Sequence, residues 1–233
     1  MKCLILFVLF ATFFTTLSAF MLKISSVKSV RFLNRVNAVK MSAQTDQQRI
    51  SVLVPVANGS EEIETVTIVD TLIRGGACVT LAAISSPTLQ VRCSRGVELV
   101  ADRFISDCLT EEWDMIVCPG GDVGAQHMSA CHCLNELLSK QDAAGKYLGA
   151  ICAAPAKVLA AGGHGKGHPM TCYPSSKYIE QLGARHVGDN KVVVSRHIIT
   201  SQGPGTALEF SLKLVELLFG EEKAAQVRHG MVA

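Results

Sequence analysis

From residue 50 onward, short apolar runs alternate with segments of helical pattern, and this alternation constrains the fold more than any other feature of the sequence. The runs are rich in Val, Ile and Leu, as expected for strands buried on both faces. The predicted strands cover residues 50–56, 79–83, 115–118, 147–151, 192–194 and 198–200. Helical patterns follow at residues 129–140, 153–161 and 206–219. We therefore expect one doubly wound α/β domain, with a mostly parallel sheet and helices on both faces.

Another helix is predicted directly after the first strand. Ser60 is expected to cap it, and Gly75-Gly76 to end it. Its apolar stripe is predicted to contain Ile63, Val66, Val69, Leu72 and Ile73, while Glu61 and Glu62 are interpreted as solvated acids of the first turn. Residues 90–93 and 97–100 have the pattern of a small hairpin.

The net charge of +2 hides an asymmetry between the start of the chain and the rest. Residues 1–50 carry seven Lys or Arg and one acid, which leaves 15 basic and 19 acidic side chains in the remainder. A domain of net negative charge is a poor match for a phosphate backbone, so we expect no nucleic-acid binding.

The first 48 residues are interpreted as leader segments outside the fold. Lys2, the apolar run after it and Ser18-Ala19 are typical of a signal peptide over residues 1–20. Residues 21–48 are rich in basic and small polar residues, as in a transit peptide. With Phe20 at the junction, the leader resembles the bipartite leaders of plastid proteins of red-algal origin; secretion or another endomembrane compartment is the alternative. The mature domain, 49–233, is expected to have no membrane contact.

Nine cysteines are present, but their spacing is not that of a disulfide framework. Cys131-His132-Cys133 lacks a second pair at zinc spacing, so we expect no metal site. Residues 120–124 lack the full glycine pattern of a dinucleotide site, and we predict no cofactor. Most of the thiols, Cys78 and Cys118 among them, are interpreted as core residues.

Three predicted strands end in motifs that can carry chemistry, at residues 59–64, 118–122 and 149–155. In parallel sheets, ligands bind where the carboxyl ends of strands turn into helices. Cys152 stands between an apolar strand and an Ala-rich helix among small residues, which is the pattern of a nucleophile elbow. The helix amino terminus is expected to lower the thiol pKa. The alternative is an inert core cysteine.

From Ile50 to Val232 the chain resembles the ThiJ/PfpI superfamily, and within it the parkinsonism-associated deglycase (DJ-one) branch. The matching stretches follow one another along the chain: 59–65, 93–95, 119–121 with 124–126, 150–153, and 203–206 with Glu209-Phe210. The resemblance implies a flavodoxin-like fold, a homodimer and an active site without a cofactor.

The resemblance also implies which residues react. Cys152 matches the nucleophile and oxidation site of the family, and Glu64 matches the acid that donates a hydrogen bond to its sulfur. A carboxyl group in an apolar pocket beside a thiolate should have a raised pKa, which suits a proton shuttle.

Four further positions are implied by the same resemblance. The backbone N–H groups of Gly121 and Ala153 match an oxyanion hole. Gly120 and Arg95 match substrate-binding positions, with Arg95 contributed by the opposite subunit of the dimer. A surface arginine at a hairpin tip is the alternative for Arg95.

Two positions depart from the family. Protease-like and amidotransferase-like members have a His directly after the nucleophile, where this chain has Ala153, so a Cys-His protease loses its base. The animal deglycases have a His where this chain has Tyr173. Tyr173 is therefore a candidate catalytic residue that can donate a hydrogen bond but is a poor base at neutral pH.

Two classes of function use the same residues. In the first, Cys152 attacks a 2-oxoaldehyde such as methylglyoxal and Glu64 moves a proton, giving a 2-hydroxy acid without glutathione; removal of early glycation products would be related chemistry. In the second, Cys152 is oxidised to a sulfinic acid and the protein acts as an oxidation sensor or redox-regulated chaperone. The sequence leaves both open.

Overall fold

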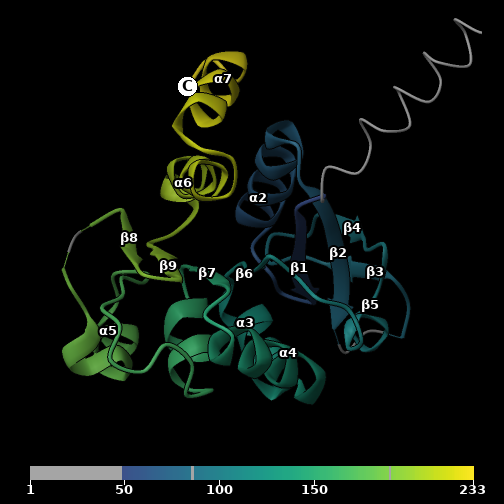
Figure 1. Cartoon of the computed structure of the whole chain (residues 1–233). Coiled ribbons are helices and arrows are strands. Elements are labelled where there is room, and N and C mark those ends of the chain that lie inside the picture. Colours follow the sequence, from purple (N-terminus) through teal and green to yellow (C-terminus); the bar gives the residue numbers. More distant parts are fainter. Residues whose placement is uncertain (1–48, 85–86, 189) are drawn as a thin grey trace, which may run out of the picture. The chain divides into compact units, whose positions relative to one another are not determined.

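The apolar runs pair into a seven-stranded sheet with the order β5-β2-β1-β6-β7-β9-β8 (Figure 1). Its strands are β1 (Ser51–Ala57), β2 (Cys78–Ile84), β5 (Arg103–Phe104), β6 (Met115–Cys118), β7 (Tyr147–Ile151), β8 (Val192–Ser195) and β9 (Ile198–Ser201). Every neighbouring pair is parallel except β8 and β9. The computed structural model describes residues 49–84, 87–188 and 190–233, and Ile50–Ala233 form one compact unit. The doubly wound, mostly parallel fold is confirmed.

The three strands at the middle of the sheet position the site. β1, β6 and β7 are neighbours, and their side chains are almost all buried. Because the three strands are parallel, their carboxyl ends lie at the same edge of the sheet. The motifs that follow Ala57, Cys118 and Ile151 are thereby brought together.

Helices cover both faces of the sheet. Figure 1 shows α2 (Glu62–Gly75), α6 (Ala207–Phe219) and α7 (Glu221–Gly230) on one side, and α3 (Asp122–Ala130), α4 (His132–Ala143) and α5 (Ser176–Leu182) on the other. The helix predicted at 129–140 corresponds mainly to α4, because the extended backbone at Cys131 ends α3 and begins α4. Most of α3, and all of α5 and α7, were not predicted from the sequence.

The start and the outer face of α2 differ from the prediction. Glu61, not Ser60, caps the helix, with its Oε2 accepting the Glu64 N–H at 2.8 Å. Ile63 is 55% exposed, and Val66 and Ile73 are similarly exposed. The buried face instead combines Ile68 and Leu72 with small polar residues, so the predicted stripe was wrong for these three side chains.

The predicted hairpin is present as β3 (Gln90–Arg92) and β4 (Glu98–Val100), which pair antiparallel in a separate two-stranded sheet. The eight cysteines of the described part of the chain are all free. Cys118 is buried as expected, but Cys78 is exposed because it opens β2 before the strand enters the core.

The leader predictions, a signal peptide over residues 1–20 and a transit-like segment over 21–48, lie outside the described residues. Across residues 49–84, 87–188 and 190–233, none of the helices has both the length and the apolar character needed to cross a membrane.

A group of histidines lies between α4 and the β8–β9 turn. His197 Nε2 contacts Asp142 Oδ1 at 2.7 Å, and its ring packs edge-on against His168 at 5.2 Å. Nearby, His164 is buried, and its Nε2 atom has no hydrogen-bond partner. Burial lowers the pKa of His164, and the Asp142 carboxylate opposes this only in part.

His164 should make the fold sensitive to mild acid. Because its pKa is lowered in the folded protein, the unfolded chain binds the proton more tightly, and stability is lost as the pH falls below about 6.5. We expect His164→Leu to reduce the difference in unfolding free energy between pH 7.5 and pH 5, measured by urea denaturation. The exposed His132→Leu is the control, and an unchanged pH dependence in His164→Leu would contradict the assignment.

Candidate active site

Gly120 lies where the three strand-end loops meet. A methyl group on its Cα would lie 2.5 Å from Cys152 Cβ and 2.8 Å from Glu64 Oε2. Its carbonyl accepts the Glu61 N–H at 3.1 Å. Only glycine leaves room for the cysteine and the carboxyl group to approach each other here, so Gly120 forms the floor between them.

Cys152 directly follows β7 and has a strained backbone. Its φ is 64°, in the left-handed region that non-glycine residues rarely adopt. The Cys152 N–H donates to the Ser201 carbonyl at 3.0 Å, and its carbonyl accepts the Tyr173 N–H at 2.8 Å. These two bonds hold the turn that aims the side chain away from the sheet and toward Gly120.

Glu64 reaches the same point from the first turn of α2. Helical side chains lean toward the amino terminus of their helix, which here faces the strand ends. Glu64 Oε2 accepts the Gly120 N–H at 2.7 Å, and the residue is fully buried. Glu64 Oε1 is also buried and has no hydrogen-bond partner. This oxygen can therefore interact with the Cys152 side chain.

Burial raises the pKa of Glu64 to about 8, against the opposing effect of the Gly120 N–H. Burial and the Glu64 carboxylate likewise raise the pKa of the Cys152 thiol. The expected lowering of this pKa is present only as the contribution of the Ala153 N–H, and burial outweighs it. The predicted helix 153–161 is only the short π-type segment η2 (Pro155–Ala160), too short for a large dipole. Both shifts favour the protonated forms of the two groups.

Two backbone donors act in the opposite direction. The N–H groups of Gly121 and Ala153 interact with the Cys152 sulfur and lower its pKa, although less than burial raises it. Gly121 has φ 85°, a conformation that suits glycine and turns its N–H toward the elbow. These donors would stabilise negative charge that develops during a reaction at this point.

Tyr173 is beside the site through its backbone, but its side chain is 44% exposed. Its ring packs edge-on against Tyr178 at 6.4 Å. Tyr178 is buried, and its phenol donates to Asp122 Oδ1. Tyr173 is a predicted site residue and Tyr178 is not, because α5, which carries Tyr178, was not predicted.

Arg95 and the first turn of α2 are joined by Glu62. The Arg95 N–H donates to Glu62 Oε1 at 2.7 Å, and Ser94 Oγ donates to Oε2 at 2.8 Å. Glu61 and Glu62 are both 7% exposed, so their interpretation as solvated acids was wrong. They are buried because one caps α2 and the other holds the hairpin turn, a contact that only the tertiary structure creates.

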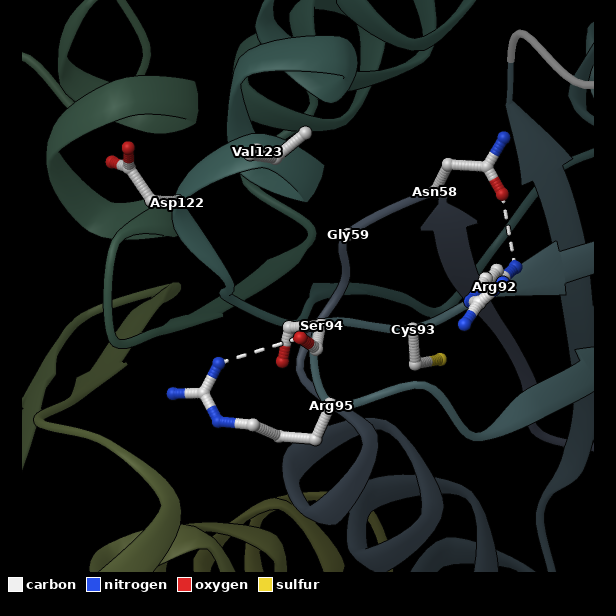
Figure 2. A pocket seen from close by; sticks show the side chains of 8 residues that line it. All are labelled: Asn58, Gly59, Arg92, Cys93, Ser94, Arg95, Asp122 and Val123. Atoms are coloured by element: carbon white, nitrogen blue, oxygen red, sulfur yellow. Dashed lines mark hydrogen bonds between the residues drawn. The ribbon is translucent and has the colours of Figure 1, made fainter.

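A cleft of about 500 Å³ opens beside these residues (Figure 2). The cleft is lined by Asn58, Gly59, residues 92–95, Asp122 and Val123. Figure 2 shows the Arg95 side chain extended along the cleft. Cys152 does not line this cleft, but Asp122 follows Gly121 and so connects the two. Among the described residues, no group of three or more His, Cys, Asp or Glu side chains is arranged to hold a metal ion.

Comparison with known proteins shows the family of the chain. The model of the DJ-1/PfpI family matches residues 50–217. The chain belongs to the DJ-1/PfpI family.

Three relatives illustrate this membership. Oxidised DJ-1 from Toxoplasma gondii is 43% identical, with a TM-score of 0.75 over 78% of this chain and 98% of that one. The glutathione-independent glyoxalase DJR-1.2 of Caenorhabditis elegans is 39% identical over 76% of this chain and 92% of its own length. Protein DJ-1 homolog B of Arabidopsis thaliana is 39% identical over 85% of this chain. The match spans only 45% of that plant protein, about half of its length.

The role of Gly120 can be tested by adding one methyl group. Gly120→Ala should lower the thermal midpoint and slow alkylation of Cys152, because the new Cβ would overlap both the cysteine and Ile151 O, which it would approach to 2.9 Å. Overpacking of this kind costs about 1–3 kcal/mol. Gly230→Ala is the control, since its Cβ would meet no atom within 4 Å. Wild-type behaviour of Gly120→Ala in both measurements would show that the floor is not needed.

Proposed function

We propose that this member of the DJ-1/PfpI family converts reactive 2-oxoaldehydes, such as methylglyoxal and glyoxal, to 2-hydroxy acids without glutathione or a cofactor. The proposal depends on one observation, the approach of Cys152 and the buried Glu64 on either side of Gly120. The glyoxalase name of the C. elegans relative supports this reaction class.

The first step would be addition of the thiol to the aldehyde carbon. A C–S bond forms, the thiol proton passes to the carbonyl oxygen, and the product is a hemithioacetal. Glu64 can carry this proton, because it lies beside the sulfur and its pKa of about 8 allows exchange near neutral pH. The Gly121 and Ala153 N–H groups would stabilise the oxygen as its negative charge develops.

The second step would move a proton between the two substrate carbons. The Glu64 carboxylate takes the proton from the hemithioacetal carbon and returns it to the neighbouring carbon. The proton of the hemithioacetal hydroxyl passes to the neighbouring carbonyl oxygen, so that the first carbon becomes the thioester carbonyl and the second carries a hydroxyl group. The resulting thioester is hydrolysed by water, which releases the 2-hydroxy acid and restores the thiol. One water is consumed, and no external oxidant or reductant is required. Removal of early glycation products would follow from the same chemistry or from removal of the free aldehyde.

The decisive experiment follows hydroxy-acid formation from methylglyoxal. Cys152→Ser should have almost no turnover because no other residue replaces the nucleophile, and Glu64→Gln should lose about 100-fold or more in kcat because an amide exchanges no proton. Wild-type kcat should rise as the pH approaches 8, since the carboxylate is the base. Cys78→Ser, which removes an exposed thiol, is the control.

Full turnover in Cys152→Ser would overturn this mechanism. The competing function is oxidation sensing, which the oxidised state of the T. gondii relative favours. It would be preferred if the wild type consumed no methylglyoxal while limiting peroxide oxidised Cys152 before the other described cysteines, as mapped by mass spectrometry.

We also propose that two copies of the chain associate through an apolar face. Ile63, Val66 and Ile73 of α2 are exposed, as are Val97 and Val100 of the hairpin. Glu62 joins the hairpin turn to the start of α2, so the two elements that carry these side chains are in contact, with Arg95 at their junction. Exposed apolar patches of this kind are typical of interfaces.

Val66→Glu should convert a dimer to a monomer in sedimentation velocity experiments, because the carboxylate would be buried without a partner. Val187→Glu changes an exposed valine elsewhere and should remain dimeric. A wild-type protein that sediments as a monomer would exclude this assembly.

A further inference from the structure

Three side chains from two other elements converge on Asp122, the first residue of α3. Lys157 Nζ lies 2.6 Å and Lys177 Nζ 2.8 Å from Asp122 Oδ1, and the Tyr178 phenol donates to the same oxygen. Lys157 also donates to the Asp122 carbonyl at 3.0 Å. The hydrogen bonds from Lys157, Lys177 and Tyr178 hold the pKa of Asp122 well below its usual range, so it is a carboxylate at neutral pH.

Each element that meets at Asp122 also holds part of the Cys152 site. Asp122 follows Gly121, whose N–H interacts with the sulfur. Lys157 lies on η2, directly after the elbow, and its N–H donates to the Ala153 carbonyl at 2.9 Å. The third element, α5, follows the segment in which the Tyr173 N–H donates to the Cys152 carbonyl. The carboxylate therefore closes a ring of contacts around the reacting group.

Of the three side chains that contact Asp122, Tyr178 is the most buried. It is 5% exposed, whereas the two lysines reach solvent. A negative charge on the Cys152 sulfur acts on the Tyr178 phenol. Lys177 Nζ lies 4.8 Å from the centre of the Tyr178 aromatic ring. The Tyr178 hydroxyl group donates its hydrogen bond to Asp122. Loss of the hydroxyl alone would thus change the ring of contacts without changing any charge.

We propose that Tyr178 is a positioning residue that acts through Asp122 to hold the Gly121 N–H against the Cys152 sulfur. The inference deepens the proposed function, and it rests on Cys152 being the reactive group. A misplaced N–H would stabilise the thiolate less, so loss of the Tyr178 hydroxyl makes Cys152 less reactive. If Asp122 acted only through its charge, its removal would have the opposite effect. Loss of the negative charge would favour the Cys152 thiolate and make the cysteine more reactive.

The test measures Cys152 alkylation by iodoacetamide in the full chain as a function of pH, with the modified cysteine identified by mass mapping. Tyr178→Phe should lower the rate at pH 7.5 about fivefold, the factor that corresponds to roughly one hydrogen bond, and move the pH profile to higher pH. Tyr147→Phe removes a hydroxyl at the start of β7, the end of the strand away from Cys152, and should leave the profile unchanged.

A double-mutant cycle shows whether Tyr178 acts through Asp122. Tyr178→Phe should keep its effect in the Asp122→Asn background, which retains an acceptor oxygen, and lose it in the Asp122→Ala background. A wild-type profile for Tyr178→Phe, or an equal effect in both backgrounds, overturns the proposal.

Methylglyoxal consumption, measured in parallel, separates this inference from the proposed function. If the wild type consumes no methylglyoxal but Tyr178→Phe slows alkylation, the positioning role stands and the enzymatic proposal fails. If the wild type is active and Tyr178→Phe alkylates normally, the enzymatic proposal stands and the positioning role fails.

Discussion

The site depends on the absence of a side chain at Gly120. Cys152 from the end of β7 and Glu64 from the first turn of α2 approach each other over this residue, and its N–H donates to the carboxyl group. Any larger residue would separate them. Because the surrounding backbone is part of the central sheet, it cannot move aside at low cost. The chemistry available to the protein follows from this one close approach.

The same close approach explains the raised pKa values of Cys152 and Glu64. A buried carboxyl group next to a buried thiol disfavours charge on either group, so both have raised pKa values. The N–H groups of Gly121 and Ala153 offset part of this for the sulfur. The ionisation of each group therefore depends on the state of the other, because the two share one buried site.

Local sequence patterns predicted the elements that have strong periodicity and clear ends. The runs around β1, β6 and β7 were identified because buried parallel strands are continuously apolar. Short elements without such a signal, such as β5 and α5, were missed. The apolar stripe on α2 was predicted wrongly because Ile63, Val66 and Ile73 have the spacing of side chains that face a core. The buried face of the helix instead contains threonines and Glu64. Hydrophobicity alone does not distinguish a core face from an exposed apolar face.

By itself, the sequence determined the alternation of strands and helices, the cysteine at the end of β7 and the glycines at the end of β6. These are local properties, since periodicity and the need for small residues in tight turns can be read within a few positions. Only the tertiary structure decided that Glu62 holds the hairpin turn, that Tyr178 rather than Tyr173 is the buried tyrosine, and that burial raises the thiol pKa. Each of these depends on contacts between segments far apart in the chain, and burial and pKa are set by all the atoms that surround a group.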